Sequence, residues 1–366
     1  GRAITIFHRE SDPKKLEQCK VIFNQIFSSL DWLENYTAIK YPFAKYDIII
    51  VPGFQYGGME HMGATLYSDR TMFIDENATI SEQLDRAKLI AHETAHMWFG
   101  DFVTMEWFDD VWTKEVFANW FASQIVTPLY PEVNHRLNFI NTYYPASYSE
   151  DRTAGSNSIQ QELDNLSNAG LVYGNIIYNK APIVMEMLVK RVGEENFRLG
   201  IQAYLRKFAY SNASWDDLIK ILDSLSPEDL QSWSNAWVKE KGMPSYTSEI
   251  IKDSVVWKQS DPFGRGIVWK QDFSSIIVND GKNRAIVPNT DGRGYGLFLM
   301  DSTSSRFLLK TFEQYKPKSN SGKNISVIDD EVARASLLIS LYENMLAGKI
   351  LPEKFVSSLM KYLQNE

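Results

Sequence analysis

The sequence predicts an α+β protein: a long, mostly helical region with a small N-terminal sheet, then a small β-rich region, then further helix. Two observations support this prediction. Through most of residues 12–240, apolar residues recur every three or four positions, the period of an amphipathic helix. From residue 246 to about residue 323, short runs rich in valine, isoleucine and tryptophan alternate with turn signals, which is typical of strands. We therefore expect the architecture to change near residues 242–244.

Composition narrows the class of protein. A chain of 366 residues is too long for one ordinary core, so we expect two or three domains. The net charge of −8 and the lack of a basic run argue against nucleic acid as a partner. No apolar stretch reaches transmembrane length. The single cysteine, Cys19, allows no internal disulfide; this suits a reducing compartment, and also a periplasmic or secreted protein built without disulfides. The oligomeric state stays open.

The first elements follow from local signals. Residues 3–7 are strand-like, and a helix is expected after Asp12, a good N-cap, with Pro13 at its first position. Residues 46–51 form a short apolar run that predicts a buried strand. A glycine-rich, extended segment follows at residues 52–63. Because the chain opens directly on a strand, we expect a fragment of a longer protein.

A helix over residues 79–100 carries the most informative motif. Thr79 and Glu82 can form a capping box at its start, and an apolar stripe follows. Residues 92–96 read His-Glu-Thr-Ala-His. Since positions i and i+4 share a helix face, His92 and His96 can point both rings at one ion, with Glu93 one step round. This pattern is a zinc metalloprotease signature.

A second helix, over residues 109–126, supplies a third ligand. Glu115 is separated from His96 by 18 residues, and Val111, Ala118 and Ala122 share its helix face. Two neighbouring helices would then deliver two imidazoles and a carboxylate to one tetrahedral zinc, with water in the fourth position. A structural histidine pair and a solvated Glu115 are the alternatives.

The remaining elements are expected in order. Residues 143–159 are polar and predicted to be irregular. Helices are then predicted over residues 173–192 and 193–208, from Ser214, and from Ser226 with Pro227 at its first position. Strands are predicted at residues 254–257, 266–269 and 274–278, with a turn at 279–281. Residues 329–363 return to a helical period.

The glycine-rich segment offers a substrate-binding carboxylate. Gly57 and Gly58 let a peptide backbone approach closely, as an added strand. Glu60 can bind the free α-ammonium group of a substrate, which would place the cut one residue from the N-terminus. A surface glutamate in a turn is the alternative for this motif taken alone.

These motifs resemble those of the M1 zinc aminopeptidases, the gluzincin group. The resemblance is carried by residues 92–107 with Glu115, by Gly57-Gly58-Met59-Glu60-His61, and by residues 177–181. It implies a thermolysin-like catalytic domain over residues 1–245, a small β-sandwich domain over 246–326 and the start of a helical C-terminal domain over 327–366. The family's N-terminal β-domain and most of its helical domain would be missing. The chain departs from the family at His61, where Asn is usual, and at Lys114 and Val116, where Asn and Gly are common.

The resemblance also implies the chemistry. One Zn²⁺ per chain would be held by His92, His96 and Glu115, with Glu93 as general base and Tyr178 as the donor to the oxyanion. Gly57, Gly58, Met59, Glu60 and His61 would bind peptides that have a free N-terminus. Apart from the resemblance, Asp109 and Asp110 are candidates to orient the histidine rings, although a helix-start role favoured by the helix dipole is the preferred interpretation of both. Two alternatives remain: a thermolysin-type zinc endopeptidase with the same ligands, and a non-catalytic module of the same fold.

Overall fold

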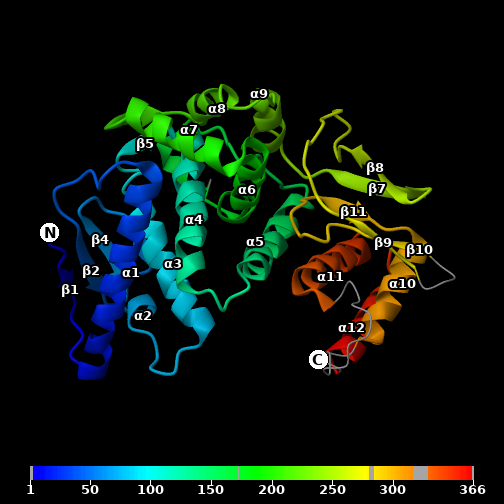
Figure 1. The fold of residues 1–366 in the computed structure, drawn as a ribbon, viewed down its shortest axis with the longest axis horizontal. Helices are drawn as coiled ribbons and strands as arrows, with labels where there is room; N and C mark the ends of the chain where they lie inside the picture. The colour runs from blue at the N-terminus through cyan, green and yellow to red at the C-terminus, as the bar shows by residue number, and fades with distance from the viewer. Residues whose placement is uncertain (1–2, 172, 280–283, 316–328, 365–366) are drawn as a thin grey trace. The chain divides into compact units, whose positions relative to one another are not determined.

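The computed structural model describes residues 3–171, 173–279, 284–315 and 329–364. The chain forms two compact units (Figure 1). The first comprises Gly1–Val133 and Ile159–Ser234, and the second comprises Asn134–Ser158 and Asn235–Glu366. The protein is mixed α and β, with more helix than strand, as the sequence predicts.

A small sheet opens the first unit. Its order is β1 (Ile6–Phe7), β2 (Asp47–Val51), β4 (Ala64–Ser68) and β3 (Gly58–Met59). β1, β2 and β4 run parallel, and β3 pairs antiparallel with β4, with Met59 opposite Leu66. Strand β4 was not predicted from the sequence. It matters because it holds β3, and therefore the glycine-rich motif, at one edge of the sheet.

Helix α1 (Pro13–Thr37) begins where the sequence predicts. The Asp12 side chain accepts a hydrogen bond from the Lys14 N–H, and Pro13 occupies the first turn. Its buried residues, among them Ile26 and Leu30, pack against α3 (Ile80–His96). The short helix α2 (Asp69–Met72) follows β4. Within the described ranges, no helix combines the length and apolarity needed to cross a membrane.

Helices α3 and α4 (Trp112–Val126) form the centre of the first unit and pack side by side (Figure 1). The predicted capping box is present: the Thr79 hydroxyl accepts from the Glu82 N–H, and the Glu82 carboxylate accepts from the Thr79 N–H at 2.7 Å. Helix α4 is buried almost all round, as expected of a helix that is apolar on every face. Both helices are therefore fixed by core packing.

The other elements of the first unit surround this pair. They are β5 (Val103–Met105), η1 (Phe108–Asp110), η2 (Thr127–Leu129), η3 (Leu166–Leu171), η4 (Ile176–Lys180), α6 (Ala181–Val192), α7 (Glu194–Lys207), β6 (Ser211–Ala213), α8 (Trp215–Asp223) and α9 (Leu230–Ser234).

The helix predicted from residue 173 instead begins with a π-helical turn, η4. The start predicted at Ser226, with Pro227 in the first turn, is wrong. Helix α9 begins at Leu230, whose N–H donates to the Asp223 carboxylate.

The irregular segment predicted at residues 143–159 is also wrong over most of its length. Helix α5 (His135–Asp151), in the second unit, runs through it and starts at Asn134, whose side chain caps the Leu137 N–H. Its buried residues are Ile140, Tyr143, Tyr144, Ser147, Tyr148 and Asp151. This helix was not predicted because its buried face consists mainly of tyrosines and polar residues, and because Pro145 interrupts the helical pattern.

The second unit holds two small sheets beside its helices. One has the order β11 (Leu297–Leu299), β7 (Ser245–Ile251) and β8 (Ser254–Ser260); the other pairs β9 (Ile276–Asn279) with β10 (Arg284–Val287). The π-helical segment η5 (Asn235–Lys239) precedes β7. The strand predicted at residues 266–269 is wrong: the Trp269 N–H donates to the Gln259 side chain and the indole is fully buried. Residues 280 and 281 of the predicted turn lie outside the described residues.

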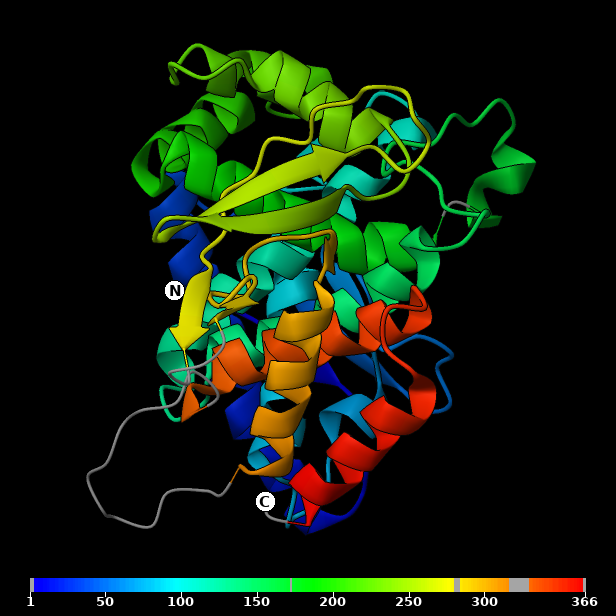
Figure 2. The same cartoon turned by 90° about the vertical axis from the view of Figure 1, so that its right-hand side faces the viewer.

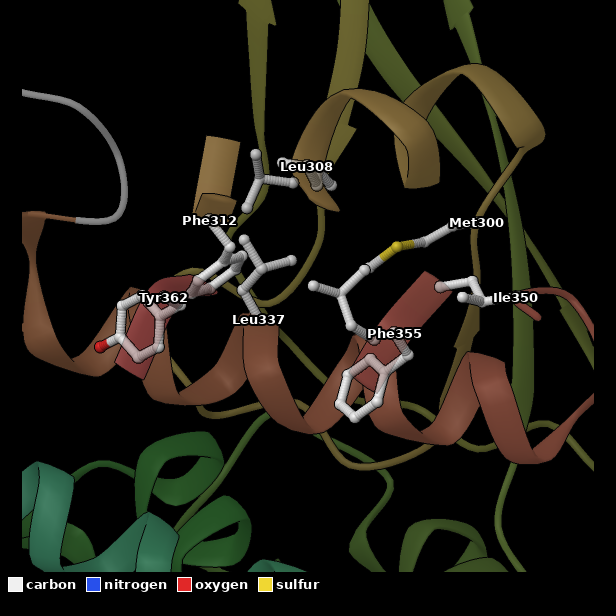
Figure 3. Close-up of a cluster of buried hydrophobic side chains, with 9 residues drawn as sticks. Met300, Leu308, Phe312, Leu337, Ile350, Phe355 and Tyr362 are labelled. Atoms are coloured by element: carbon white, nitrogen blue, oxygen red, sulfur yellow. The ribbon is translucent and has the colours of Figure 1, made fainter. Parts of the chain in front are cut away.

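Three helices complete the second unit: α10 (Ser302–Glu313), α11 (Glu331–Leu346) and α12 (Pro352–Leu363). Figure 2 shows α10 and α12 side by side. Helix α10 lies in a stretch predicted to be strands, and Asp301 caps it through the Thr303 and Ser304 N–H groups. A cluster of buried apolar side chains joins these helices (Figure 3). Its members include Met300, Leu308, Phe312, Leu337, Leu341, Ile350, Phe355 and Tyr362.

Truncation inside this cluster is expected to destabilise the second unit. Leu308 is fully buried, so Leu308→Ala should lower the free energy of unfolding by about 2–5 kcal/mol in urea denaturation, through lost burial and a residual cavity. Leu363→Ala is the matched control, because Leu363 is 57% exposed in the same unit and should change stability by less than about 0.5 kcal/mol. Equal effects of the two substitutions would contradict this description of the core.

Candidate metal centre

Helix α3 brings its two histidine rings together. His92 and His96 are four residues apart, so they lie on the same face. Their Nε2 atoms are 3.1 Å apart, and the two rings meet edge to face at 85°. Two imidazole nitrogens at this distance face one small volume, as the helical spacing predicts.

Helix α4 directs Glu115 at the same volume. Its Oε2 atom is 3.5 Å from His92 Nε2 and 3.8 Å from His96 Nε2. All three ligand atoms lie within 4.8 Å of one another. Glu115 is therefore not a solvated surface residue: its side chain is 8% exposed and points at both rings. The structure brings together the three side chains that the sequence predicts as ligands.

The other nitrogen of each ring is held by an oxygen. His92 Nδ1 lies 3.0 Å from Asn119 Oδ1, and His96 Nδ1 lies 3.1 Å from the Phe99 carbonyl oxygen. Because both partners are acceptors, each Nδ1 donates its hydrogen to them, which directs each Nε2 toward the shared volume as a potential metal ligand. This is the usual arrangement of histidines that bind a metal.

The expectation that Asp109 or Asp110 orients the rings is wrong. The Asp110 carboxylate accepts hydrogen bonds from the Trp215 N–H at 3.0 Å and from Gln160 Nε2 at 2.8 Å. These bonds join η1 to the start of α8 and to the segment around Gln160. Sequence reasoning missed Asn119 for a simple reason. It lies on α4 four residues after Glu115, and only the packing of α4 on α3 brings its amide to His92.

Glu93 lies beside this group without joining it through hydrogen bonds. Its carboxylate is buried, and its Oε2 atom has no hydrogen-bond partner among the described residues. Burial raises the pKa of Glu93 to about 8, although the nearby His92 acts in the opposite direction. Gly58 packs directly on this side chain, since a Cβ atom at Gly58 would lie 2.3 Å from Glu93 Oε1. A larger residue at position 58 would require the Glu93 side chain to move.

The donor set fits zinc. Two imidazoles and one carboxylate make a three-ligand protein set typical of catalytic zinc sites. Three carboxylates gather here, those of Glu60, Glu93 and Glu115, and Lys114 is the nearby ammonium group. A divalent cation would offset the remaining negative charge, and it would give the unpaired oxygen of Glu93 a positive neighbour.

Glu60 follows strand β3 and forms an ion pair with Lys114. The Lys114 Nζ atom is 2.5 Å from Glu60 Oε1 and 3.4 Å from Glu115 Oε1. Burial opposes the charged form of Lys114, but the two carboxylates outweigh it and raise the pKa of its ammonium group. The sequence marks Lys114 only as an unusual neighbour of Glu115, and does not predict this contact.

Comparison with known proteins identifies the family to which this chain belongs. The Peptidase family M1 domain matches residues 22–256, which is most of the chain and includes every residue of the centre described above. The chain belongs to peptidase family M1.

Relatives of this M1 chain come from several kingdoms. It is 34% identical over 233 residues to the puromycin-sensitive aminopeptidase of Caenorhabditis elegans, which covers 63% of the chain and 25% of that protein. It is 35% identical over 235 residues to aminopeptidase N of Streptomyces lividans, with 64% and 27% covered. It is 32% identical over 327 residues to aminopeptidase N of Lactococcus lactis subsp. lactis (strain IL1403), with 89% and 37% covered. The chain therefore spans well under half the length of these relatives.

Tyr178 of this M1 chain lies on the π-helical segment η4, a local form that is frequent at functional sites. Its side chain is 38% exposed, and its ring stacks on Tyr173 with centroids 6.2 Å apart. Burial and then the negative charge of Glu115 raise the pKa of Tyr178, so its phenol keeps its proton.

The rest of the glycine-rich motif is placed by β3. Gly58 and Met59 form the strand, and the Gly57 carbonyl oxygen accepts the Ser68 N–H at 2.9 Å. The His61 side chain is exposed; its backbone N–H donates to the Met59 carbonyl at 3.0 Å. His61 is outside both groups of potential ligands found among the described residues, namely His92, His96 and Glu115, and Glu60, Glu93 and His96.

The Asn119 hydrogen bond should tune metal affinity. Replacing Asn119 with Ala removes the acceptor that orients the His92 ring, so the dissociation constant for zinc is expected to rise about 10–100-fold in competition with a chromophoric chelator. Asn119→Asp keeps an oxygen acceptor at this position and should bind zinc as tightly as the wild type. Wild-type affinity in the Ala variant would show that this contact does not orient the ligand.

Proposed function

We propose that this chain carries the active site of a zinc aminopeptidase, which hydrolyses the N-terminal peptide bond of peptides. One observation carries the proposal. In a chain of family M1, the side chains of His92, His96 and Glu115 converge beside a buried Glu93, with Glu60 next to them on an edge strand. The relatives named above are aminopeptidases by name.

His92, His96 and Glu115 would hold one zinc ion through their Nε2 and carboxylate atoms. When bound, zinc supplies a Lewis acid that polarises the scissile carbonyl and lowers the pKa of a water molecule to about 7. With a cation nearby to favour its charged form, the Glu93 carboxylate would accept a proton from the attacking water and pass it to the leaving amine. Its placement supports this role, because its carboxylate adjoins the ligands and has an oxygen with no hydrogen bond from the part of the chain that the structure describes.

Tyr178 would stabilise the negative charge that develops on the carbonyl oxygen. Its phenol keeps its proton and is partly exposed, so it can donate a hydrogen bond to a bound substrate. One such donor lowers the barrier by roughly 2.7–4 kcal/mol in well-studied hydrolases. Tyr178 would thus act on the transition state and would not serve only to pack against its neighbours.

Glu60 would fix the position of the cut. Strand β3 is at one edge of its sheet, so a peptide can add to it as a further strand. In this pose Gly57, Gly58, Met59 and His61 would line the backbone of the peptide, and the Glu60 carboxylate would receive its α-ammonium group. A free N-terminus would then be the feature that selects the substrate.

We also propose the finer domain assignment. Residues 1–245 would be the thermolysin-like catalytic domain, residues 246–326 a small β-sandwich domain, and residues 327–366 the start of a helical domain. The family match over residues 22–256 supports the first of these. The sheets of β7, β8 and β11 and of β9 and β10 support a β-rich second part, although α10 lies within it.

A zinc endopeptidase of the thermolysin type is the second candidate. It would use the same ligands and base, and the ion pair of Glu60 with Lys114 favours it, because the carboxylate already has a cationic partner. A non-catalytic module is disfavoured, since His92, Glu93, His96, Glu115 and Tyr178 are all retained together.

Metal removal tests the proposed function. The full-length protein should hydrolyse amino-acid arylamides, lose this activity on dialysis against a chelator and regain it with zinc.

Glu93→Gln should still bind zinc but lower kcat by about 10²–10⁴-fold, because the proton acceptor is gone. Undiminished turnover by the chelated protein, or by Glu93→Gln, would rule out the mechanism.

Glu60→Gln separates the exopeptidase from the endopeptidase. The wild type should prefer leucine arylamide over its N-acetyl form, and Glu60→Gln should lose about tenfold or more in kcat/KM for the free amine alone, through the missing charge-assisted hydrogen bond. Glu76→Gln is the control, because this carboxylate pairs with Lys14 on the surface. The exopeptidase assignment fails if Glu60→Gln cleaves the free-amine substrate at wild-type efficiency.

A further inference from the structure

Lys114 places a cation on the carboxylate that the proposed function reserves for the substrate. Its Nζ atom lies 2.5 Å from Glu60 Oε1, and the side chains of Lys114 and Glu60 are only 18% and 16% exposed. A pair so shielded from water interacts more strongly than an exposed surface salt bridge. The contact is therefore a substantial interaction within the site.

The position of Lys114 is set by the elements around it. It lies in the first turn of α4, one residue before the proposed ligand Glu115, so its backbone is fixed by the buried helix. The chain after α3 packs on its stem, since a Cβ atom at Gly100 would lie 3.6 Å from Lys114 Cβ. The ammonium group is thus tethered next to Glu60.

The amino end of a peptide and the Lys114 side chain present the same group. Each is an ammonium with three N–H donors, and each is suited to a carboxylate acceptor. We propose that Lys114 is a specificity-determining residue that competes with the α-ammonium group of the substrate for Glu60. This inference rests on the proposed role of Glu60.

Competition has a defined kinetic consequence. A substrate with a free amine must displace the tethered ammonium before it binds, which raises KM and leaves kcat unchanged, because the interaction is lost before the chemical step. A substrate with a blocked amino end does not need Glu60 and is unaffected. The site therefore discriminates less between free and blocked N-termini than it would with a neutral residue such as Asn at position 114.

Binding of L-leucinamide to the zinc-loaded full-length protein tests this directly. Calorimetry should show about tenfold tighter binding to Lys114→Met than to the wild type, while N-acetyl-leucinamide binds both equally. Lys114→Gln, which keeps a polar side chain of similar length, should behave in the same way. KM for leucine arylamide should fall by the same factor at constant kcat, whereas a purely structural role would lower kcat.

Two controls keep the outcome specific. Adding Glu60→Gln should abolish the gain from Lys114→Met, and Lys45→Met, which breaks a pair with Asp47 at 2.7 Å, should have no effect. Zinc content is measured for every variant, because Lys114 also neighbours Glu115.

Unchanged leucinamide binding in both Lys114 variants, or a gain in binding that persists with Glu60→Gln, overturns the inference. Tighter binding without any hydrolysis would support competition while refuting the proposed function.

Discussion

The site depends on one electrostatic constraint: several carboxylates are gathered in a volume that water scarcely reaches. Burying a negative charge is costly unless a positive charge or hydrogen-bond donors compensate it. Lys114 compensates the charge of Glu60 and part of that of Glu115, whereas one Glu93 oxygen has no hydrogen-bond partner in the described ranges of the chain. A divalent cation between the His92 and His96 rings would satisfy this balance, so the charges, as well as the geometry, favour a metal centre.

Core packing makes that arrangement possible. Helix α4 is buried on nearly every face, and its contact with α3 fixes where Glu115 and Asn119 point. Gly58 lets strand β3 approach Glu93 so closely that a side chain at position 58 would displace the Glu93 carboxylate. The sheet edge, Glu93 and the proposed ligands are consequently parts of one packed structure.

The same closeness links catalysis to substrate choice. The residue before a proposed ligand, Lys114, reaches the carboxylate proposed to bind the amino end of a peptide. A neutral residue at position 114 would leave the Glu60 carboxylate without this cationic partner, whereas Lys114 forms an ion pair with it. Substrate preference in this chain would then depend on a competition between two ammonium groups, one tethered to α4 and the other brought by the peptide.

The sequence by itself determined the features that depend on local spacing. The capping box of Thr79, the helical pairing of His92 with His96 and the start of α1 follow from periods and side-chain chemistry within a few residues. What required the tertiary structure depends on contacts between distant segments. The pairing of β4 with β3, the tyrosine-faced helix α5 and the contacts of Asn119 and Lys114 were decided by packing, because no local pattern records which partner a polar or aromatic side chain meets across the core.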